Sequence, residues 1–413
     1  RSKILEKASQ LILNNCDELA KLLCNEIGKP IKQAIQEVKR SADILKLAAE
    51  EALRIGGEVV PLSRQENSNK RFTYYNYYPL GPVLAVTPFN FPLATVAHKL
   101  APAIAAGNSV ILKPSPMAAI TAYNFVKILL QAGLPEEIIC LLNCSNQQTE
   151  RLVQDYRIKA VTFTGSSNIG WHLRSIAHPG TKVLLELGGN SPVIVCEDGD
   201  LNKAIPACIR GAFGFSGQSC ISVQRIYLHE RILPDFLEQF VEAAKDLSVG
   251  NPSDPETDLG PLINEAAVKR IHLWVEEAVS EGSKVLCGGK PLEGNLYPPT
   301  VLRDLKTKMN IMSSEVFGPI VNIISFNSLD EAIEQANDTI YGLSAGAFTE
   351  SLDTAFELSN KLNAGTVLIN DSSTFRADEM PINGLSQSGS GLEGPKYLMK
   401  ELSNFKVSCI NLG

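Results

Sequence analysis

The 413-residue sequence contains no CxxC pair, no HExxH motif and only five histidines. Most zinc and redox sites are built from such pairs and clusters, so we expect no metal site. We find no signal-peptide pattern in the printed sequence and no apolar run of about 18 residues, the length that a membrane-spanning helix needs. The nine cysteines are odd in number, and several lie in apolar runs. These features predict reduced thiols in a cytoplasmic protein.

The sequence also lacks a basic surplus. Its formal net charge of −7 argues against nucleic acid or an anionic membrane as the main partner and leaves a small molecule as the expected one. A single core stops growing at about 250–300 residues, so this length predicts two or three packed units. Because Arg1 already lies within a helical pattern, we expect that some natural sequence precedes it.

Short apolar segments alternate with helical segments along most of the chain. The expected strands of a first series cover 83–86, 109–112, 138–142, 160–163 and 183–185, and those of a second series cover 193–195, 223–228, 321–326, 345–348 and 366–369. Such alternation is typical of parallel sheets covered by helices. We therefore predict an α/β protein with two α/β domains, accompanied by extended segments at 74–78 and 404–411.

Residues 163–170 (FTGSSNIG) follow an expected strand and begin an expected helix. The free N–H groups and the dipole of a helix N-terminus favour an anion, so this segment suits a phosphate. Its spacing is not GxGxxG, however, and a plain tight turn is the alternative.

Cys220 lies in the sequence Gly-Gln-Ser-Cys, a turn of small residues. A thiol in such a turn is more exposed than one in an apolar run, which makes Cys220 the best candidate nucleophile among the nine cysteines. A structural cysteine is the alternative.

Two further polar residues follow expected strands. Glu186 ends an apolar strand beside Gly188 and Gly189, where desolvation would raise the pKa of its carboxyl group toward the range of a general base. A salt-bridged glutamate at a domain boundary is the alternative. Asn90 lies between two aromatic residues and two prolines. Its amide can donate to an oxyanion or cap the next helix.

Seven motifs occur in order along the chain: TPFNFPL, KPSP, FTGS, LELGGNSP, GQSC, EVFGP and PxxGxxxSGxGxEG. Their order and spacing resemble the aldehyde dehydrogenase superfamily over residues 90–394. The resemblance implies a non-acylating, NAD(P)-dependent member with the aldehyde dehydrogenase-like fold. That fold has a Rossmann-variant cofactor domain without GxGxxG, a second α/β catalytic domain and a small β oligomerisation element.

The resemblance also implies catalytic roles. Cys220 matches the nucleophile that forms a thiohemiacetal and then a thioester with the aldehyde. The Asn90 side chain and the Cys220 backbone N–H would hold the oxyanion. Glu186 matches the base that activates water for hydrolysis. The implied reaction oxidises an aldehyde to a carboxylic acid.

The implied cofactor is NAD or NADP. Lys113 matches a ligand of the adenosine ribose, and Glu315 and Phe317 match residues at the nicotinamide ribose and ring. The other expected cofactor contacts are Ser115, Pro116, Gly165, Ser166, Gly170 and Leu187. Many NAD-preferring relatives have glutamate where this chain has Pro116. Since that carboxylate would repel a 2′-phosphate, its absence leaves both cofactors open.

Two arginines suggest an anionic substrate. Arg376 falls where many relatives place an aromatic residue of the substrate tunnel, and Arg40 falls on a helix that borders the tunnel. Arginine binds anions bidentately, although two surface arginines in ordinary ion pairs are the alternative. The other expected substrate contacts are Phe91, His98, Ser219 and Ile221. For His98, a place on the helix surface is the alternative. The expected substrate is a small lactaldehyde-, semialdehyde- or glyceraldehyde-3-phosphate-like molecule.

We expect residues 1–60 and 79–188 to form the cofactor domain and residues 189–395 the catalytic domain. Residues 61–78 and 396–413 resemble segments that pair between subunits, which predicts a homodimer or homotetramer. Two rival hypotheses are a CoA-acylating enzyme, a branch that usually lacks the base matched by Glu186, and a catalytically silent protein with this fold. The usual PFGGxKxSG reads PINGLSQSG at 381–389, which puts the packing of that loop in question.

Overall fold

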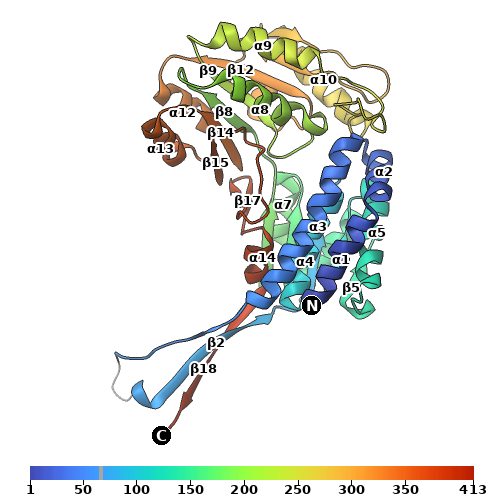
Figure 1. Ribbon diagram of the computed structural model, residues 1–413, viewed down its shortest axis with the longest axis vertical. Helices are drawn as coiled ribbons and strands as arrows, with labels where there is room; N and C mark the ends of the chain where they lie inside the picture. The colour runs from blue at the N-terminus through green and yellow to red at the C-terminus, as the bar shows by residue number, and fades with distance from the viewer. Residues whose placement is uncertain (65–67) are drawn as a thin grey trace.

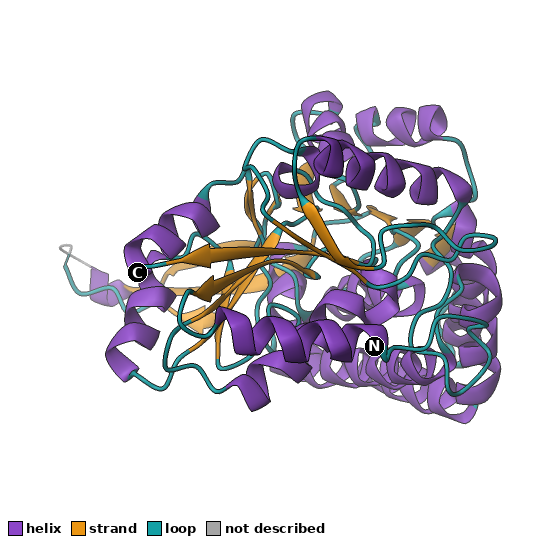
Figure 2. Ribbon diagram, turned by 90° about the horizontal axis from the view of Figure 1, so that it is seen from above, coloured by secondary structure: helices purple, strands orange, loops and turns teal. Residues whose placement is uncertain are grey.

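The computed structural model describes residues 1–64 and 68–413, which form three parts (Figure 1). Two α/β units, each with its own sheet, follow one another along the long axis, and a narrow ribbon of strands projects from one end. Seen from above, helices lie around the strands (Figure 2). No helix among the described residues is long and apolar enough to cross a membrane.

The first unit contains a six-stranded sheet in the order β17-β7-β6-β3-β4-β5. Its strands are β3 (Val83–Val86), β4 (Val110–Lys113), β5 (Ile139–Leu141), β6 (Ala160–Thr164), β7 (Lys182–Glu186) and β17 (Gly389–Ser390). β17 is antiparallel to β7, and the other pairs are parallel. The helices and 3-10 turns between the strands are α4 (Pro92–Ala106), η2 (Pro116–Ala118), α5 (Ala119–Gln131), η3 (Glu136–Ile138), α6 (Asn146–Gln154) and α7 (Ser167–Ile176).

Three N-terminal helices pack on α4 and α5, on one side of this sheet: α1 (Ser2–Asn14), α2 (Cys16–Ile27) and α3 (Ile31–Arg54). α1 buries Leu5, Ala8 and Ile12 at helical spacing, and α3 packs against both α1 and α4. The first N–H of α3, that of Ile31, donates to the Pro252 carbonyl of the second unit at 2.8 Å. The N-terminus of α3 is therefore fixed to one unit while the body of the helix packs on the other.

The second unit contains a seven-stranded sheet in the order β10-β11-β12-β9-β8-β14-β15. Its strands are β8 (Ser191–Val195), β9 (Val223–His229), β10 (Lys284–Cys287), β11 (Thr300–Arg303), β12 (Ile320–Phe326), β14 (Ser344–Phe348) and β15 (Thr366–Ile369). β10 is antiparallel to β11, and the other pairs are parallel. The helices are α8 (Leu201–Phe213), η4 (Gly214–Gly217), α9 (Leu233–Lys245), α10 (Glu265–Ser280), α11 (Asn310–Ser313), α12 (Leu329–Asn337) and α13 (Leu352–Lys361).

The projecting ribbon joins segments from both ends of the chain (Figure 1). It contains β1 (Glu58–Val59), η1 (Ser68–Lys70), β2 (Arg71–Pro79) and β18 (Ser403–Asn411), which follows α14 (Pro395–Glu401). β18 runs antiparallel to β2 along the whole length of both strands. The extended segment at 74–78 and the tail strand at 404–411 thus pair with each other. A separate short pair, β13 (Tyr341–Gly342) with β16 (Leu385–Ser386), lies near the second unit.

The predicted α/β class and both series of strands are confirmed, but the structure adds elements that the sequence analysis did not expect. β10 and α13 are examples, and the mixed, partly exposed pattern of β10 explains why it was missed. Residues 389–401 pack with the first unit, because β17 pairs with β7 and α14 packs on α4. The expected boundary at 395 therefore falls between two elements of the same unit, since the chain returns to the first sheet before it ends.

Candidate active site

The three residues predicted for catalysis lie on loops that meet between the two units. Glu186 is the last residue of β7, and Asn90 lies between β3 and α4. Both therefore lie at the carboxyl ends of parallel strands, where α/β sheets bind ligands. Cys220 lies between η4 and β9 of the second unit. The Asn90 amide reaches the Cys220 loop, because its Nδ2 donates to the Gln218 carbonyl oxygen at 3.1 Å.

The turn before Cys220 has a strained backbone. Phe215, Ser216 and Gly217 have φ angles of 48°, 55° and 68°. This region costs a non-glycine residue about 1–3 kcal/mol and persists only where the surrounding structure enforces it. A Cβ on Gly217 would lie 2.0 Å from the Gly318 carbonyl oxygen, so only glycine fits there. Close packing thus fixes the backbone that carries Cys220.

Cys220 is half-buried, and carboxylates act on its thiol. Burial, followed by the charges of Glu315 and Glu186, raises the pKa of Cys220 to about 12, while Arg376 acts weakly in the opposite direction. In this state the side chain is a neutral thiol at neutral pH. Since the thiolate is the nucleophile, attack by Cys220 requires a group that takes the thiol proton.

Gly188 and Gly189 bring the catalytic loops together. A Cβ on Gly189 would lie 2.2 Å from the Cys220 carbonyl oxygen, and a Cβ on Gly188 would lie 2.5 Å from Glu315 Oε2. The Gly189 N–H donates to Glu315 Oε1 at 3.1 Å. The glycines of the LELGG sequence therefore allow the end of β7, the Cys220 loop and the Glu315 loop to meet.

Glu186 is buried, with an exposed fraction of 7%. Burial raises the pKa of Glu186 well above its ordinary value and the charge of Glu393 raises it further, against the opposing charges of Lys99 and Arg376. Within the described part of the chain, Glu186 Oε1 has no hydrogen-bond partner. An oxygen without a partner does not fit the salt-bridged alternative. A carboxylate with a raised pKa binds a proton more readily than an exposed one, as suits a general base.

Two buried charges near Glu186 were not among the predicted site residues. Lys99 Nζ lies 2.6 Å from Glu393 Oε1 and donates to Thr162 Oγ1 at 2.9 Å. Burial alone would raise the pKa of Glu393, but the positive charge of Lys99 holds it below its ordinary value. The sequence carried a signal for both residues. Lys99 is a lysine within an apolar helix, and Glu393 is the glutamate of the last motif.

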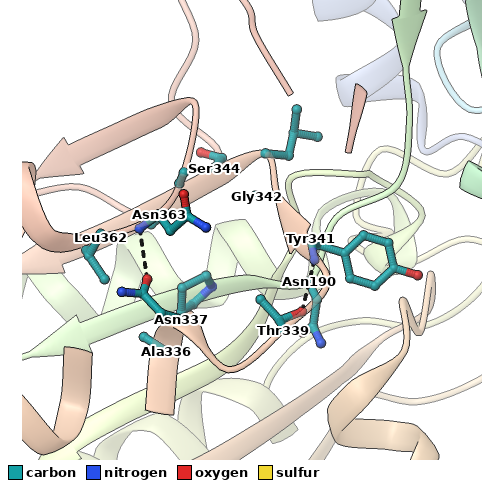
Figure 3. Close-up of a pocket in the computed structure, with 13 residues that line it drawn as sticks. Asn190, Ala336, Asn337, Thr339, Tyr341, Gly342, Ser344, Leu362 and Asn363 are labelled. Carbon is teal, nitrogen blue, oxygen red and sulfur yellow. Dashed lines mark hydrogen bonds between the residues drawn. The ribbon is translucent and has the colours of Figure 1, made fainter. Parts of the chain in front are cut away.

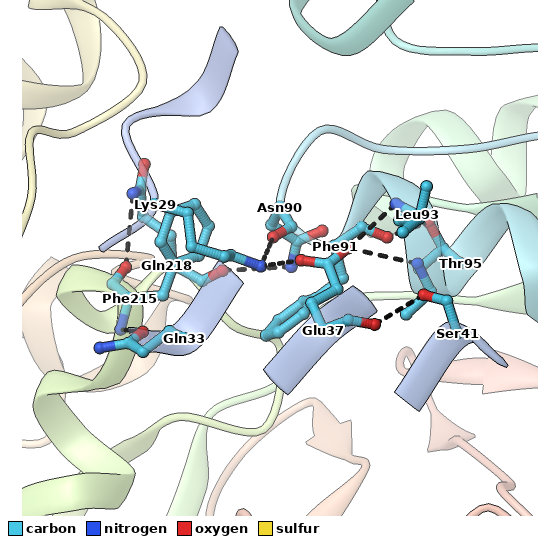
Figure 4. Close-up of polar contacts among 11 residues, drawn as sticks. Lys29, Gln33, Glu37, Ser41, Asn90, Phe91, Leu93, Thr95, Phe215 and Gln218 are labelled. Atoms are coloured by element: carbon cyan, nitrogen blue, oxygen red, sulfur yellow. Dashed lines mark hydrogen bonds and ion pairs between the residues drawn. The ribbon is translucent and has the colours of Figure 1, made fainter. Parts of the chain in front are cut away.

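Asn90 does not cap the helix that follows it. Phe91 is the N-cap of α4, and the N–H groups of Leu93 and Ala94 donate to Glu37 Oε1 at 2.9 and 3.2 Å (Figure 4). The cap alternative is therefore wrong. The Asn90 amide is buried and already donates into the loop before β9, so it can donate to an oxyanion formed there.

All the residues predicted for the cofactor except Glu315 and Phe317 lie along one edge of the first sheet. They follow or end β4, β6 and β7, or lie in α7: Lys113, Ser115, Pro116, Gly165, Ser166, Gly170 and Leu187. Ser166, the N-cap of α7, makes no side-chain cap hydrogen bond, and the buried hydroxyls of Thr164 and Ser167 find no partner among residues 1–64 and 68–413. Free N–H groups and hydroxyls at a helix N-terminus fit a phosphate group, which favours the phosphate interpretation over a plain turn. A Cβ on Gly170 would lie 2.3 Å from Leu187 Cδ2, so glycine allows α7 to pack close to the strand ends.

Glu315 and Phe317 lie on the loop before β12, across the gap from the first sheet. Burial raises the pKa of Glu315 to about 7, although the hydrogen bond from Gly189 acts in the opposite direction. Phe317 has a φ of 51°, and its ring packs edge-on against Phe89 with the ring centroids 5.9 Å apart. Because Phe89 precedes Asn90, this contact joins the two units beside the catalytic residues.

The two predicted substrate arginines differ in their partners. Arg40 binds Asp378 with two nitrogens: Nη2 lies 2.6 Å from Oδ1, and Nε lies 2.9 Å from Oδ2. His98 is buried rather than on the helix surface, and its Nε2 lies 3.0 Å from the same Oδ1. Nε and Nη2 of Arg376 are inaccessible to solvent and have no partner in the part of the chain that the structure describes. Arg40 thus forms an ion pair, which agrees with the alternative of ordinary ion pairs. Arg376, by contrast, keeps two nitrogen donors without a partner among the described residues.

The other predicted substrate contacts, Phe91, Ser219 and Ile221, are half-buried neighbours of Asn90 and Cys220. The Phe91 ring contacts the ring of Phe215 across the gap, with centroids 6.1 Å apart. A separate small pocket, to which Asn190 and Tyr341 contribute, lies beside β13 and β14 (Figure 3). None of the residues that line it is a predicted site residue. No group of three or more His, Cys, Asp or Glu residues in the described ranges is placed to hold a metal ion.

Comparisons with known proteins agree with this geometry. A model of the aldehyde dehydrogenase family matches residues 1–408. The 3-sulfolactaldehyde dehydrogenase of Priestia megaterium is 42% identical over 413 residues, which are 100% of this chain and 86% of that protein. The structure of the glyceraldehyde-3-phosphate dehydrogenase GapN of Methanocaldococcus jannaschii with NADP has a TM-score of 0.95 at 40% identity, covering 100% of this chain and 89% of its own. Aldehyde dehydrogenase 21 of Physcomitrella patens, solved with its reaction product succinate, has a TM-score of 0.97 at 41% identity, covering 100% and 86%.

The fold and these matches define an NAD(P)-dependent oxidoreductase that acts on aldehydes. The chain belongs to the aldehyde dehydrogenase family. The predicted family, fold class, enzyme class and cofactor are thereby confirmed.

Proposed function

We propose that the enzyme converts its aldehyde to a carboxylic acid through a thioester on Cys220. One observation carries this proposal: the Cys220 loop, the Asn90 amide and Glu186 converge. The Asn90 amide donates into the Cys220 loop. The charge of Glu186 acts on the thiol, and Glu186 Oε1 has no hydrogen-bond partner among the described residues. In the described part of the chain, these three groups provide a nucleophile, an oxyanion donor and a base.

In the first step, Cys220 Sγ forms a bond to the aldehyde carbon, and the thiol proton passes to water, so that Glu186 stays free to act in the second step. The π electrons of the carbonyl group move to its oxygen, which accepts hydrogen bonds from Asn90 Nδ2 and the Cys220 N–H. When bound, NAD or NADP supplies the hydride acceptor that turns this thiohemiacetal into a thioester.

The residues proposed to hold the cofactor are the phosphate-binding turn at 165–166, Lys113 on β4, and Glu315 and Phe317 across the gap. The unpaired hydroxyls of Thr164 and Ser167 support a phosphate at this turn, within the limits of the described residues. Pro116 brings no charge to the end of β4, which is compatible with either NAD or NADP.

In the second step, Glu186 takes a proton from a water molecule as the water oxygen attacks the thioester carbon. The bond between that carbon and Sγ breaks, Sγ regains a proton, and the carboxylic acid leaves. The raised pKa of Glu186, caused first by burial and then by Glu393, suits this role because a base is most effective when its pKa lies near the working pH.

We propose a small aldehyde with an anionic group as the substrate. Burial and the nearby charge of Arg40 lower the pKa of Arg376, and two of its buried nitrogens lack a partner among the described residues. Asp378, Glu186 and Glu393 place negative charge near Arg376, and a sulfonate, phosphate or carboxylate on the substrate would supply the missing acceptors. Two of the similar proteins act on sulfolactaldehyde and glyceraldehyde 3-phosphate, and a third was solved with succinate, so all three handle small molecules with an anionic group.

We further propose that the first unit binds the cofactor, that the second carries the nucleophile, and that the ribbon pairs between subunits of a homodimer or homotetramer. The ribbon exposes large apolar side chains, among them Phe72, Tyr78, Phe405 and Val407. Exposed apolar strands favour pairing with another chain. Because a catalytic thiol must stay reduced, we place the enzyme in the cytoplasm.

The test is NAD(P)H formation at 340 nm from matched anionic and neutral aldehydes, with each cofactor, for the wild type and Cys220→Ala. We expect turnover without CoA, faster with anionic aldehydes, and no turnover by the variant. A requirement for CoA would instead support the acylating alternative. Full activity of Cys220→Ala would contradict the thioester mechanism.

A further inference from the structure

A buried ion pair lies behind Asn90. Lys29, between α2 and α3, forms a salt bridge with Glu37 of α3, and both side chains are only 1% exposed. Burial lowers the pKa of Lys29, although the charge of Glu37 acts in the opposite direction. Well-packed apolar residues often match or exceed the stability that a buried ion pair provides. The contribution of this ion pair to folding stability therefore does not explain why it is buried at this position.

The ammonium group of Lys29 contacts both sides of the catalytic gap (Figure 4). Its Nζ donates to the Asn90 carbonyl oxygen at 2.8 Å. The same atom lies 3.8 Å from the centroid of the Phe91 ring and 4.4 Å from that of Phe215. Phe91 follows Asn90, whereas Phe215 belongs to the strained turn before Cys220. Lys29 thus connects the segment that carries the oxyanion donor to the turn that carries the nucleophile.

Glu37 fixes the other end of the Asn90 segment. Its Oε2 binds Lys29, while its Oε1 accepts hydrogen bonds from the N–H groups of Leu93 and Ala94 at 2.9 and 3.2 Å. These are N–H groups of the first turn of α4, which carboxylates stabilise. Together, Lys29 and Glu37 hold the backbone on both sides of the Asn90–α4 junction.

The same face of α3 also contacts the nucleophile turn. Gln33 lies one helical turn before Glu37, and its Oε1 accepts a hydrogen bond from the Phe215 N–H at 2.7 Å. Phe215 has a positive φ, so this bond helps to hold a strained residue in place. One rigid helix therefore holds both the segment of Asn90 and the turn before Cys220.

We propose that Lys29 and Glu37 are positioning residues that set the distance between the Asn90 amide and the carbon attacked by Cys220. This inference rests on the proposed function, in which Asn90 is an oxyanion donor. Such a donor must lie about 2.7–3.1 Å from the oxyanion, and a misplacement on the order of 1 Å can cost about a hundredfold in rate. The pair acts through other residues, since it contacts the backbone of Asn90, Leu93 and Ala94 and the rings of Phe91 and Phe215.

The test uses the double variant Lys29→Met/Glu37→Gln in the full-length enzyme. Methionine keeps most of the length of the side chain without its charge, and glutamine can still accept the N–H groups of α4. The double change avoids leaving one charge buried alone, which is strongly destabilising. The matched control is Arg54→Met/Glu51→Gln, which removes an exposed ion pair at the far end of α3. Thermal unfolding shows whether each variant is folded.

If the pair positions Asn90, the folded double variant loses about tenfold or more in kcat while KM for the aldehyde changes little. The control keeps the wild-type kcat. Adding the double change to Asn90→Ala causes no further loss, because both act on the same hydrogen bond. A merely structural pair would leave kcat unchanged once the enzyme is folded, and that result would overturn the inference.

Two other results separate this inference from the proposed function. If Asn90→Ala alone leaves kcat unchanged, the proposed role of Asn90 is wrong, and the positioning role of the pair is wrong with it. If Asn90→Ala lowers kcat but the double change has an independent, multiplicative effect, only the positioning role is wrong. Should the double variant not fold, Lys29→Met alone carries the test by the same criteria. It leaves Glu37 charged but bonded to two N–H groups of α4.

Discussion

Two groups of side chains at the active site, which we call the chemical end and the recognition end, differ in the charge state that their surroundings favour. At the chemical end, formed by Cys220, Glu186 and Asn90, burial raises the pKa of both ionisable groups and so favours their neutral forms. At the recognition end, formed by Arg376, Arg40, His98 and Asp378, the two arginines and the aspartate keep their charges, whereas burial lowers the pKa of His98 and favours its neutral form. Burial alone would raise the pKa of Asp378, but hydrogen bonds from His98 and Arg40 hold it well below its ordinary value.

We therefore assign the chemical steps to the first group of residues and the recognition of the substrate to the second. Neutral groups with raised pKa values can exchange protons during the reaction, so changes at the chemical end should lower kcat for every aldehyde. Fixed charges orient a charged ligand, so changes at the recognition end should raise KM for anionic aldehydes alone. Three predictions test this division, from the largest expected effect to the smallest.

Glu186→Gln should produce the largest effect of the three. We expect steady-state kcat to fall by about 10²–10⁴-fold, because the variant forms the thioester but hydrolyses it slowly. Rapid mixing should then show a burst of NAD(P)H close to one equivalent per active site, followed by a slow phase. Glu242→Gln, on the exposed surface of α9, is the control. An unchanged steady-state rate would mean that Glu186 is not the base.

Arg376→Met should affect the recognition end alone. A hydrogen bond to a charged group contributes about 1.5–3 kcal/mol, so KM for an anionic aldehyde should rise by roughly 10–100-fold. A neutral aldehyde of the same length should be turned over with nearly the wild-type KM. Arg231→Met, which removes an exposed arginine of the second unit, is the control. Equal losses for both aldehydes would contradict the division.

Glu393→Gln should shift a pH profile rather than abolish activity. The negative charge of Glu393 raises the pKa of Glu186, and the positive charge of Lys99 lowers it. Removing the charge of Glu393 and leaving Lys99 unpaired should therefore lower the pKa of Glu186. The acid limb of the kcat–pH profile should move to lower pH, because Glu186 stays ionised under more acidic conditions. A shift to higher pH would show that Glu393 does not act on Glu186 by its charge.

Strands and motif residues that depend on local sequence pattern could be predicted from the sequence. The bounds of β3 and β15 agree with the apolar runs that predicted them. Cys220, Glu186 and Asn90 could be selected because each lies in a motif at the end of a regular element. The short strand β17 could not be predicted, since its two residues pair with β7 about 200 residues earlier in the chain.

Features that depend on distant partners could not be predicted from local pattern. Lys99 and Glu393 are 294 positions apart, and Arg40 and Asp378 are 338 apart. Both substrate arginines were plausible ligands in the sequence. The structure shows that Asp378 engages Arg40, while two nitrogens of Arg376 stay unpaired within the described residues. That difference arises only when the loop at 376–378 folds against α3.

The most direct test of the account is the detection of its covalent intermediate. Glu186→Gln is mixed with an anionic aldehyde and NADP, quenched in acid and digested, and its peptides are measured by mass spectrometry. We predict an acyl group on the Cys220 peptide that raises the peptide mass by the mass of the aldehyde less two hydrogens, because the oxidised carbonyl carbon replaces the proton of Sγ. An adduct on a different cysteine, or NADPH formation without any adduct, would contradict catalysis by a thioester on Cys220.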